Sequence, residues 1–136
     1  LPGRSSHVYA HGTRWLLDSA ISPEGVESAL ENARHTGRFD DAHTLVCMPD
    51  IKDIRSILTL LDRDRTILAT THEDHLFFDN YPDDWEVMPL TEALPAIQRR
   101  SREVIALGTM SFAAEMAAYL GLDTETWIDP WAQAQK

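Results

Sequence analysis

Four short segments of this sequence follow apolar runs and carry groups that could bind a small ligand. They are residues 18–22, 49–53, 70–72 and 108–111. In an open α/β sheet, ligands bind beyond the carboxyl ends of the parallel strands, so the position of each segment after a strand is informative. Each segment also leads into a helix or loop whose free backbone N–H groups favour anions. Any one of them alone is better explained as a helix cap or a turn, so the prediction depends on their meeting at one edge of a sheet.

Two charged side chains in these segments have suitable chemistry for a ligand contact. Asp18 could accept a hydrogen bond from a ribose hydroxyl or from an amine, and it could equally stabilise a turn. Lys52 could pair with a carboxylate or a phosphate, and it could equally be a solvated lysine in the first turn of a helix. The residue types leave both alternatives open.

Residues 108–111 form a stretch of small and polar residues. The backbone around Gly108 and Thr109 could form a concave nest of N–H groups for a phosphate or a carboxylate. The stretch lacks the G-x-x-x-x-G-K-[ST] pattern of a phosphate-binding loop, and neither G-x-G-x-x-G nor G-x-S-x-G occurs in the sequence. The sequence therefore predicts an anion contact here, without a complete phosphate-binding loop or catalytic constellation.

His72 and His75 are the clearest candidate metal ligands. Their i, i+3 spacing falls in a polar loop, which differs from the helical H-E-x-x-H arrangement, and no third ligand is evident. We therefore predict no metal site in this chain. Cys47 is the only cysteine, and its place within an apolar run predicts a buried, unreactive thiol.

Apolar runs alternate with helical patterns along the chain, which predicts the elements that position these segments. Strands are predicted at residues 7–10, 14–18, 44–48, 66–70, 85–89 and 103–108, the first two forming an N-terminal hairpin. Helices are predicted to begin at Pro23, after the capping residues Asp50 and Thr91, and near Phe112. The alternation indicates an α/β fold, a three-layer, mostly parallel twisted sheet with helices on both faces. One domain is expected to span residues 1–136, with its core at about 5–122 and a tail at 123–136.

The composition is that of an acidic globular protein, with 43% hydrophobic residues, 25% charged residues and a net charge of −10. A nucleic-acid-binding protein would carry a basic stripe, and the basic residues here are scattered, so no nucleic-acid partner is expected. No apolar run approaches the ~18 residues that a membrane span needs, and no signal peptide is visible, so no membrane contact is expected. A chain with a single cysteine cannot form an internal disulfide, and together these features favour a location in the cytoplasm. The start at Leu1 favours a fragment of a longer protein.

Taken together, the motifs resemble those of the C-terminal domain of folylpolyglutamate synthase, in the Mur ligase superfamily. The linker of that family ends in W-P-G-R, and this chain opens with Leu1-Pro-Gly-Arg. The first family strand ends in D-G-A-H-N-P, where this chain has a degenerate version that begins at Asp18 and ends at Pro23. A D-K-D-[IV] segment is matched by residues 51–54 and a late G-S-[LY] turn by residues 108–110. The resemblance runs from residue 1 to about 122.

This resemblance implies a Rossmann-like Mur ligase C-terminal domain from an ATP-dependent ligase. Such an enzyme adds glutamate to a folate carboxylate through an acyl phosphate. ATP and magnesium would be bound mainly by a preceding ATPase domain of the same protein, which would be the partner of this chain. By resemblance, Arg4 and Asp18 would contact the nucleotide, while Lys52, Gly108 and Thr109 would lie near the glutamate.

Two departures from the family pattern keep a second hypothesis open. Ile21 stands where the family has His, and Ser22 stands where it has Asn. An isoleucine cannot donate a hydrogen bond to a phosphate oxygen. The alternative is therefore a non-catalytic binding or interaction module that kept the fold and lost the chemistry. A receiver-like signalling domain would fit the length of the chain and its alternation of strands and helices. Such a domain needs two acidic residues after its first strand, however, and this chain has Asp18 followed by Ser19.

The missing phosphate-binding loop leads to a first prediction. The 136-residue chain should neither hydrolyse ATP nor ligate glutamate, because no motif in it can hold magnesium and a triphosphate together. Calorimetry should find a nucleotide affinity no tighter than about millimolar, which corresponds to about 4 kcal/mol. Micromolar binding of ATP by this chain would contradict the prediction.

Overall fold

The computed structural model describes residues 5–73 and 75–122, and within them the predicted alternation of strands and helices is confirmed. The strands are β1 (Ser6–Ala10), β2 (Thr13–Asp18), β3 (His43–Cys47), β4 (Thr66–Thr70), β5 (Val87–Pro89) and β6 (Glu103–Gly108). The helices are α1 (Pro23–Thr36), α2 (Ile54–Leu58), α3 (Leu90–Arg100) and α4 (Met110–Tyr119), with a 3-10 turn at Arg63–Arg65 before β4. Arg4 and the predicted tail at 123–136 lie outside the described residues.

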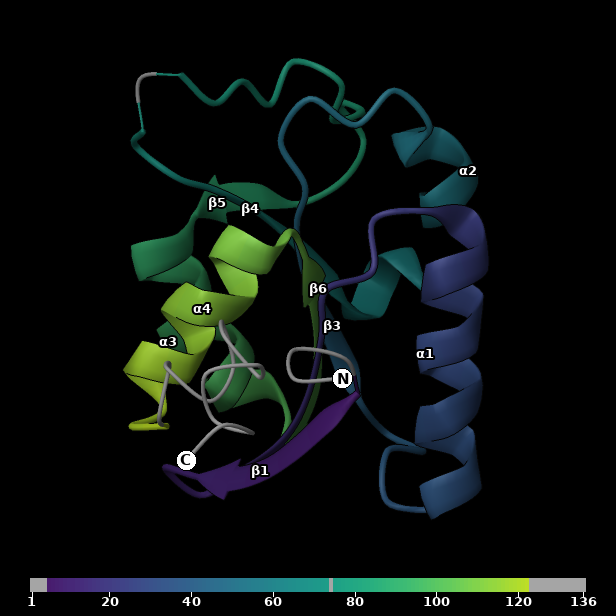
Figure 1. The fold of residues 1–136 in the computed structure, drawn as a ribbon, viewed down its shortest axis with the longest axis vertical. Coiled ribbons are helices and arrows are strands. Elements are labelled where there is room, and N and C mark those ends of the chain that lie inside the picture. The colour runs from purple at the N-terminus through teal and green to yellow at the C-terminus, as the bar shows by residue number, and fades with distance from the viewer. Residues whose placement is uncertain (1–4, 74, 123–136) are drawn as a thin grey trace, which may run out of the picture.

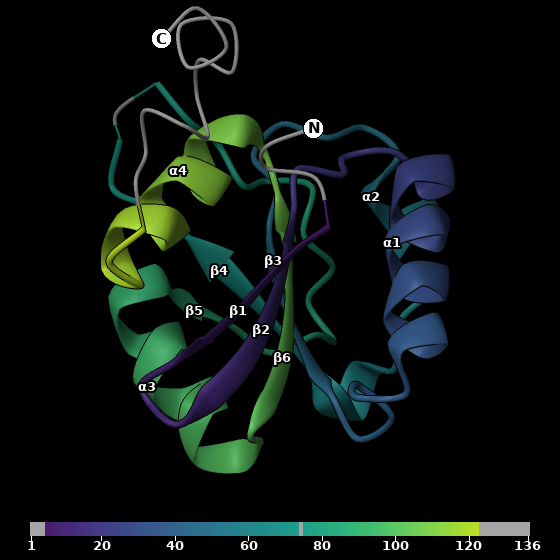
Figure 2. The ribbon, with the colours of Figure 1, turned by 60° about the horizontal axis from the view of Figure 1, so that its bottom comes forward.

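The six strands form one sheet in the order β1-β2-β6-β3-β4-β5. β1 pairs with β2 in an antiparallel hairpin, and the other pairings of the described strands are parallel. The last strand, β6, lies in the middle of the sheet between β2 and β3. Figures 1 and 2 show α1 and α2 on one face of the sheet and α3 and α4 on the other, which confirms the three-layer α/β prediction.

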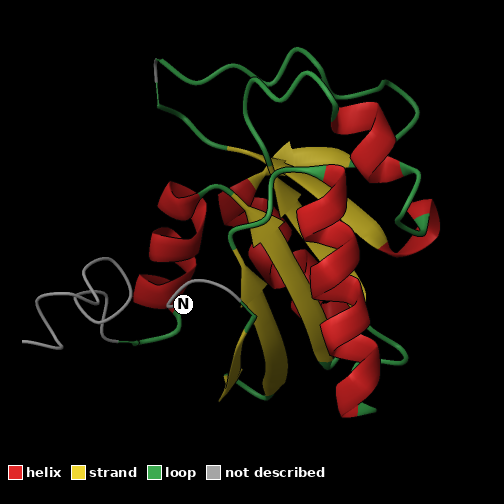
Figure 3. Cartoon of the chain, turned by 45° about the vertical axis from the view of Figure 1, so that its right-hand side comes forward, coloured by secondary structure: helices red, strands yellow, loops and turns green. Residues whose placement is uncertain are grey.

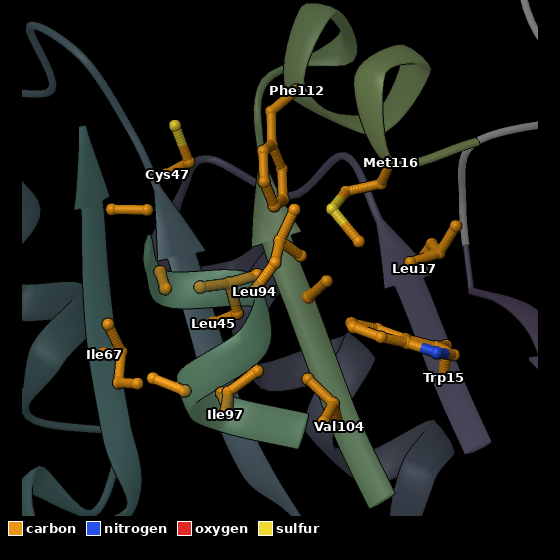
Figure 4. Close-up of a cluster of buried hydrophobic side chains, with 14 of the residues drawn as sticks. Trp15, Leu17, Leu45, Cys47, Ile67, Leu94, Ile97, Val104, Phe112 and Met116 are labelled. Carbon is orange, nitrogen blue, oxygen red and sulfur yellow. The ribbon is translucent and has the colours of Figure 1, made fainter. Parts of the chain in front are cut away.

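Side chains of the central strands alternate between two faces, and both sets are buried. Trp15 and Leu45 face α3 and α4, and Figure 4 shows Phe112 of α4 packed over this cluster. Leu16 and Val46, their neighbours in sequence, belong to the second cluster, with α1 and α2. A strand buried on both faces needs apolar residues at every position, which explains why these strands are continuous apolar runs in the sequence.

The ends of α1 follow the signals in the sequence. Ser22 Oγ accepts a hydrogen bond from the N–H of Gly25 at 3.0 Å, and Pro23 takes the first helical position. Gly37 ends the helix in the left-handed conformation, with φ 66°, where a side chain would be strained. None of the helices in the described part of the chain is both long and apolar enough to cross a bilayer.

Two of the predicted helix starts are wrong. Asp50 does not cap α2, because it adopts a left-handed conformation with φ 57° and the helix begins only at Ile54. Aspartate adopts the left-handed conformation more readily than most residue types do. The backbone N–H of Asp50 donates a hydrogen bond to the carbonyl of Phe77 at 2.8 Å. Thr91 does not cap α3 either, because β5 runs directly into the helix at Leu90 without a loop.

Gly108, the last residue of β6, lies where two strands and a helix meet. A Cβ atom at this position would overlap the backbone carbonyl oxygen of Cys47 and the ring of Phe112. The missing side chain therefore lets the end of β6 approach β3 closely while α4 folds back over the sheet.

This contact generates a stability prediction. Gly108→Ala should lower the free energy of unfolding by about 1–3 kcal/mol, because the added methyl group forces the strand end or the Phe112 ring to move. Urea denaturation measures the change. Ser111→Ala, at an exposed position in the first turn of α4, is the matched control and should have little effect. Equal stability of the Gly108→Ala variant and the parent would show that the close packing is unimportant.

Candidate functional site

The carboxyl ends of β2, β6, β3 and β4 lie together at one edge of the sheet, here called the carboxyl edge. Asp18 ends β2 and pairs in register with Leu107 of β6, and Gly108 ends β6 opposite Cys47 of β3. The topology thus places Asp18 and Gly108 on neighbouring strands at the edge where open α/β sheets bind ligands. Arg4, the other predicted nucleotide contact, lies outside the described residues.

Asp18 is a buried carboxylate, with only 4% of its surface exposed. Its Oδ2 accepts two hydrogen bonds from Ser5, one from the backbone N–H at 3.1 Å and one from the hydroxyl at 2.7 Å. Its Oδ1 is also buried and has no hydrogen-bond partner among the described residues. Buried polar atoms in proteins are nearly always paired, because an unpaired one loses the hydrogen bonds that water would give it. The unpaired oxygen therefore marks Asp18 as a candidate contact for a ligand.

The remaining predicted site residues lie on the next two strand ends. Thr109 caps α4, since its hydroxyl oxygen accepts a hydrogen bond from the N–H of Phe112 at 3.2 Å. Gly108 is buried beneath it, so any ligand contact here would be made by backbone N–H groups. Lys52 lies exposed in the turn before α2, and its side chain makes no ion pair within the described ranges. The role of these three residues stays a prediction.

The two departures from the family loop differ in their structural consequence. Ser22 caps α1 through its side chain, as an asparagine at this position could also do. Ile21 is 43% exposed between the end of β2 and the start of α1. The change at Ser22 therefore preserves local structure, whereas the change at Ile21 puts a hydrocarbon side chain at the carboxyl edge.

The long loop between β4 and β5 is fixed over this edge by hydrogen bonds that the sequence did not reveal. The Tyr81 hydroxyl accepts from the N–H of Met48 at 3.0 Å and donates to the carbonyl of Ala69 at 2.8 Å. The Asn80 amide donates to the carbonyl of Ile51 at 3.1 Å. Burial raises the pKa of Tyr81 above its ordinary value, so the phenol stays protonated and can donate. Figure 3 shows this loop beside the one that follows β3.

A pocket of about 340 Å³ opens between this loop and the helices α3 and α4. Glu73, His72 and Glu115 line it, and the pKa of Glu115 is raised by partial burial and by the nearby charge of Glu73. The hydroxyl of Thr71, also in the lining, is buried without a partner among the described residues. The carboxylates make this side of the carboxyl edge unfavourable for an anion.

Neither the histidine pair nor the cysteine forms a reactive centre in the structure. No group of three or more metal-ligating side chains occurs in residues 5–73 and 75–122, and His75 instead pairs with Glu73 at 3.5 Å. Cys47 is buried, which confirms its prediction from the sequence. Burial raises the pKa of the Cys47 thiol to about 12, so the nucleophilic thiolate is scarcely populated at neutral pH.

Comparison with known proteins shows a shared fold. No family model and no curated protein sequence matches this chain. Its structure is similar to a folylpolyglutamate synthase from Thermotoga maritima, with a TM-score of 0.68 and 22% identity over 93% of this chain and 32% of that one. It is also similar to Mycobacterium tuberculosis folylpolyglutamate synthase complexed with ADP and AMPPCP, with a TM-score of 0.62 and 18% identity over 90% of this chain and 33% of that one. The chain thus spans about a third of either structure and has a fold found in folylpolyglutamate synthases.

The Tyr81 hydrogen bonds generate a prediction for the loop. Tyr81→Phe should lower the free energy of unfolding by about 1–3 kcal/mol, because the N–H of Met48 and the carbonyl of Ala69 both lose their partner. Urea denaturation measures the loss, and Tyr9→Phe, at a tyrosine that is 73% exposed, is the control. If the two variants are equally stable, the Tyr81 hydroxyl does not anchor the loop.

Proposed function

We propose that this chain acts as the C-terminal domain of an ATP-dependent carboxylate–amine ligase similar to folylpolyglutamate synthase. In the proposed reaction, ATP transfers its γ-phosphoryl group to a folate carboxylate and leaves as ADP. The amine of glutamate then attacks the acyl phosphate, which forms the amide bond and releases inorganic phosphate and a proton. The chain would work in the cytoplasm as part of a longer protein, closing over a nucleotide that a preceding ATPase domain holds.

The observation that carries the proposal is the Asp18 oxygen Oδ1, which has no partner among the residues that the structure describes. It lies at the carboxyl end of a parallel strand, in a fold found in two folylpolyglutamate synthases, one of them complexed with ADP and AMPPCP. A ribose hydroxyl is a donor that would satisfy Asp18 Oδ1, whereas a phosphate would be repelled by the carboxylate. Because this oxygen is buried, the ligand could reach it only after the surrounding chain shifts.

Two helix starts at the same edge support a role beside an anionic ligand. α1 begins directly after the loop that follows β2, and α4 begins directly after β6. Their first N–H groups carry partial positive charge, which favours phosphate or carboxylate groups. In the proposal, Lys52 and the backbone at Gly108 and Thr109 face the glutamate, and Arg4 joins Asp18 at the nucleotide.

The described residues offer no site made wholly of protein side chains for magnesium, which on ATP takes only one or two carboxylates and otherwise phosphates and water. In the described part of the chain, no three carboxylate, histidine or cysteine side chains are grouped within reach of one ion. By the resemblance, magnesium and the triphosphate would be held by the preceding domain, and only the nucleoside end of ATP would meet this one.

A second candidate function is a binding or interaction module without ligase chemistry. The exposed hydrocarbon of Ile21 and the carboxylates of Glu73 and Glu115 favour it, because they reduce the attraction of this edge for phosphate and for glutamate. The protein sequence that precedes Leu1 distinguishes the two functions. A domain with G-x-x-x-x-G-K-[ST] supports the ligase, and a preceding domain of another kind supports the binding module.

In the longer protein, Asp18→Ala should lower kcat/KM for ATP about tenfold or more, the scale of one hydrogen bond to a charged group at about 1.5–3 kcal/mol. The matched control is Asp40→Ala, which removes an exposed carboxylate before β3, away from the carboxyl edge. Thermal unfolding of both variants checks that the fold is retained. Unchanged ATP kinetics in a folded Asp18→Ala enzyme would falsify the assignment of this residue to the nucleotide.

A further inference from the structure

Ser5 stands out because its backbone adopts a conformation that a serine rarely takes. Its φ is 50°, in the left-handed region, where a side chain crowds the backbone. Strained residues of this kind persist where the surrounding structure requires them, and they cluster at functional sites. The two contacts that Ser5 makes with its backbone N–H and hydroxyl both go to the same atom, Asp18 Oδ2.

These two hydrogen bonds control the orientation of the Asp18 carboxylate. A free carboxylate can rotate about its terminal torsion and present either oxygen, since this torsion is only weakly restricted. Two donors on Oδ2, at 3.1 Å and 2.7 Å, hold the group in one orientation. The result is one saturated oxygen, Oδ2, and one oxygen, Oδ1, that has no partner among residues 5–73 and 75–122, at a defined place on the carboxyl edge.

We infer that Ser5 is a positioning residue, which holds the Asp18 carboxylate so that Oδ1 accepts a single hydroxyl donor from a nucleoside ligand. The inference rests on the proposed function, because it takes the ligand of Asp18 to be a nucleoside. Holding the carboxylate in one orientation avoids the entropy cost of ordering it, so the ribose contact that forms once the chain around the buried Oδ1 shifts gains affinity. With Oδ2 occupied, the site offers one acceptor, which excludes a ligand that must donate to both oxygens at once.

Ser5→Gly separates this role from a merely structural one. Glycine adopts positive φ without strain and keeps the backbone N–H, so the variant loses only the hydroxyl that donates to Oδ2. Relief of strain offsets the lost hydrogen bond, and the melting temperature should therefore change little. Ser6→Gly is the matched control, because it makes the same substitution one residue away, at the start of β1.

The readout is the ratio of two affinities, measured by NMR titration of the 136-residue chain at millimolar concentrations of ligand. The probes are adenosine and adenine, which differ by the ribose. The parent chain should bind adenosine about tenfold more tightly than adenine, as expected for one hydrogen bond to a carboxylate. In Ser5→Gly the ratio should fall to about twofold with the adenine affinity unchanged, and in Ser6→Gly it should stay near tenfold.

Three results would overturn the inference, and they are distinguishable. If the parent chain does not bind adenosine more tightly than adenine, both the nucleoside site at Asp18 and the positioning role of Ser5 are wrong. If the Ser5→Gly variant keeps the tenfold preference for adenosine over adenine, the proposed site stands and only the positioning role is wrong. A preference that increases in Ser5→Gly shows that Ser5 shields Asp18 from the ligand instead of orienting it.

Discussion

The insertion of β6 between β2 and β3 is the constraint on which the rest of the structure depends. Both edges of β6 are paired and its residues from Val104 to Gly108 are buried, so it joins the two halves of the sheet and the two hydrophobic layers. The close approach at Gly108 follows from this position, because the end of the strand is enclosed by β3 and by the start of α4. The carboxyl edge forms only when this last strand has paired, since Asp18 and Cys47 then flank it.

The carboxyl edge consists of two parts with different electrostatic character. On the β2 side, two helix N-termini and the turn at Gly108 present N–H groups, with Asp18 as a single buried carboxylate. On the β4 side, Glu73 and Glu115 line a pocket in which the pKa of Glu115 is raised. An anionic ligand is therefore better accommodated on the β2 side, and a ligand group on the β4 side would have to be neutral or cationic.

The buried carboxylate also explains why the segment before β1 matters. Burying a charged group is costly unless it is hydrogen-bonded, and Ser5 supplies both described partners of Asp18. The chain before the hairpin is thereby joined to the end of β2, across the antiparallel pair. In the proposed ligase this same segment follows the preceding domain, so the Ser5 contact would connect the linker directly to the nucleoside.

The sequence by itself determined the α/β class, the sheet with helices on both faces and the ends of α1, because periodicity, Ser22, Pro23 and Gly37 are local signals. It also located the segments that reach the carboxyl edge, since these simply follow apolar strands. It could not determine the start of α2, because the left-handed turn at Asp50 is stabilised by a carbonyl 27 positions away in sequence, at Phe77. Only the tertiary structure decided that Tyr81 anchors the loop and that, within the described part of the chain, one oxygen of Asp18 is hydrogen-bonded and the other is not. Those properties depend on contacts between distant segments, which no local pattern of residues encodes.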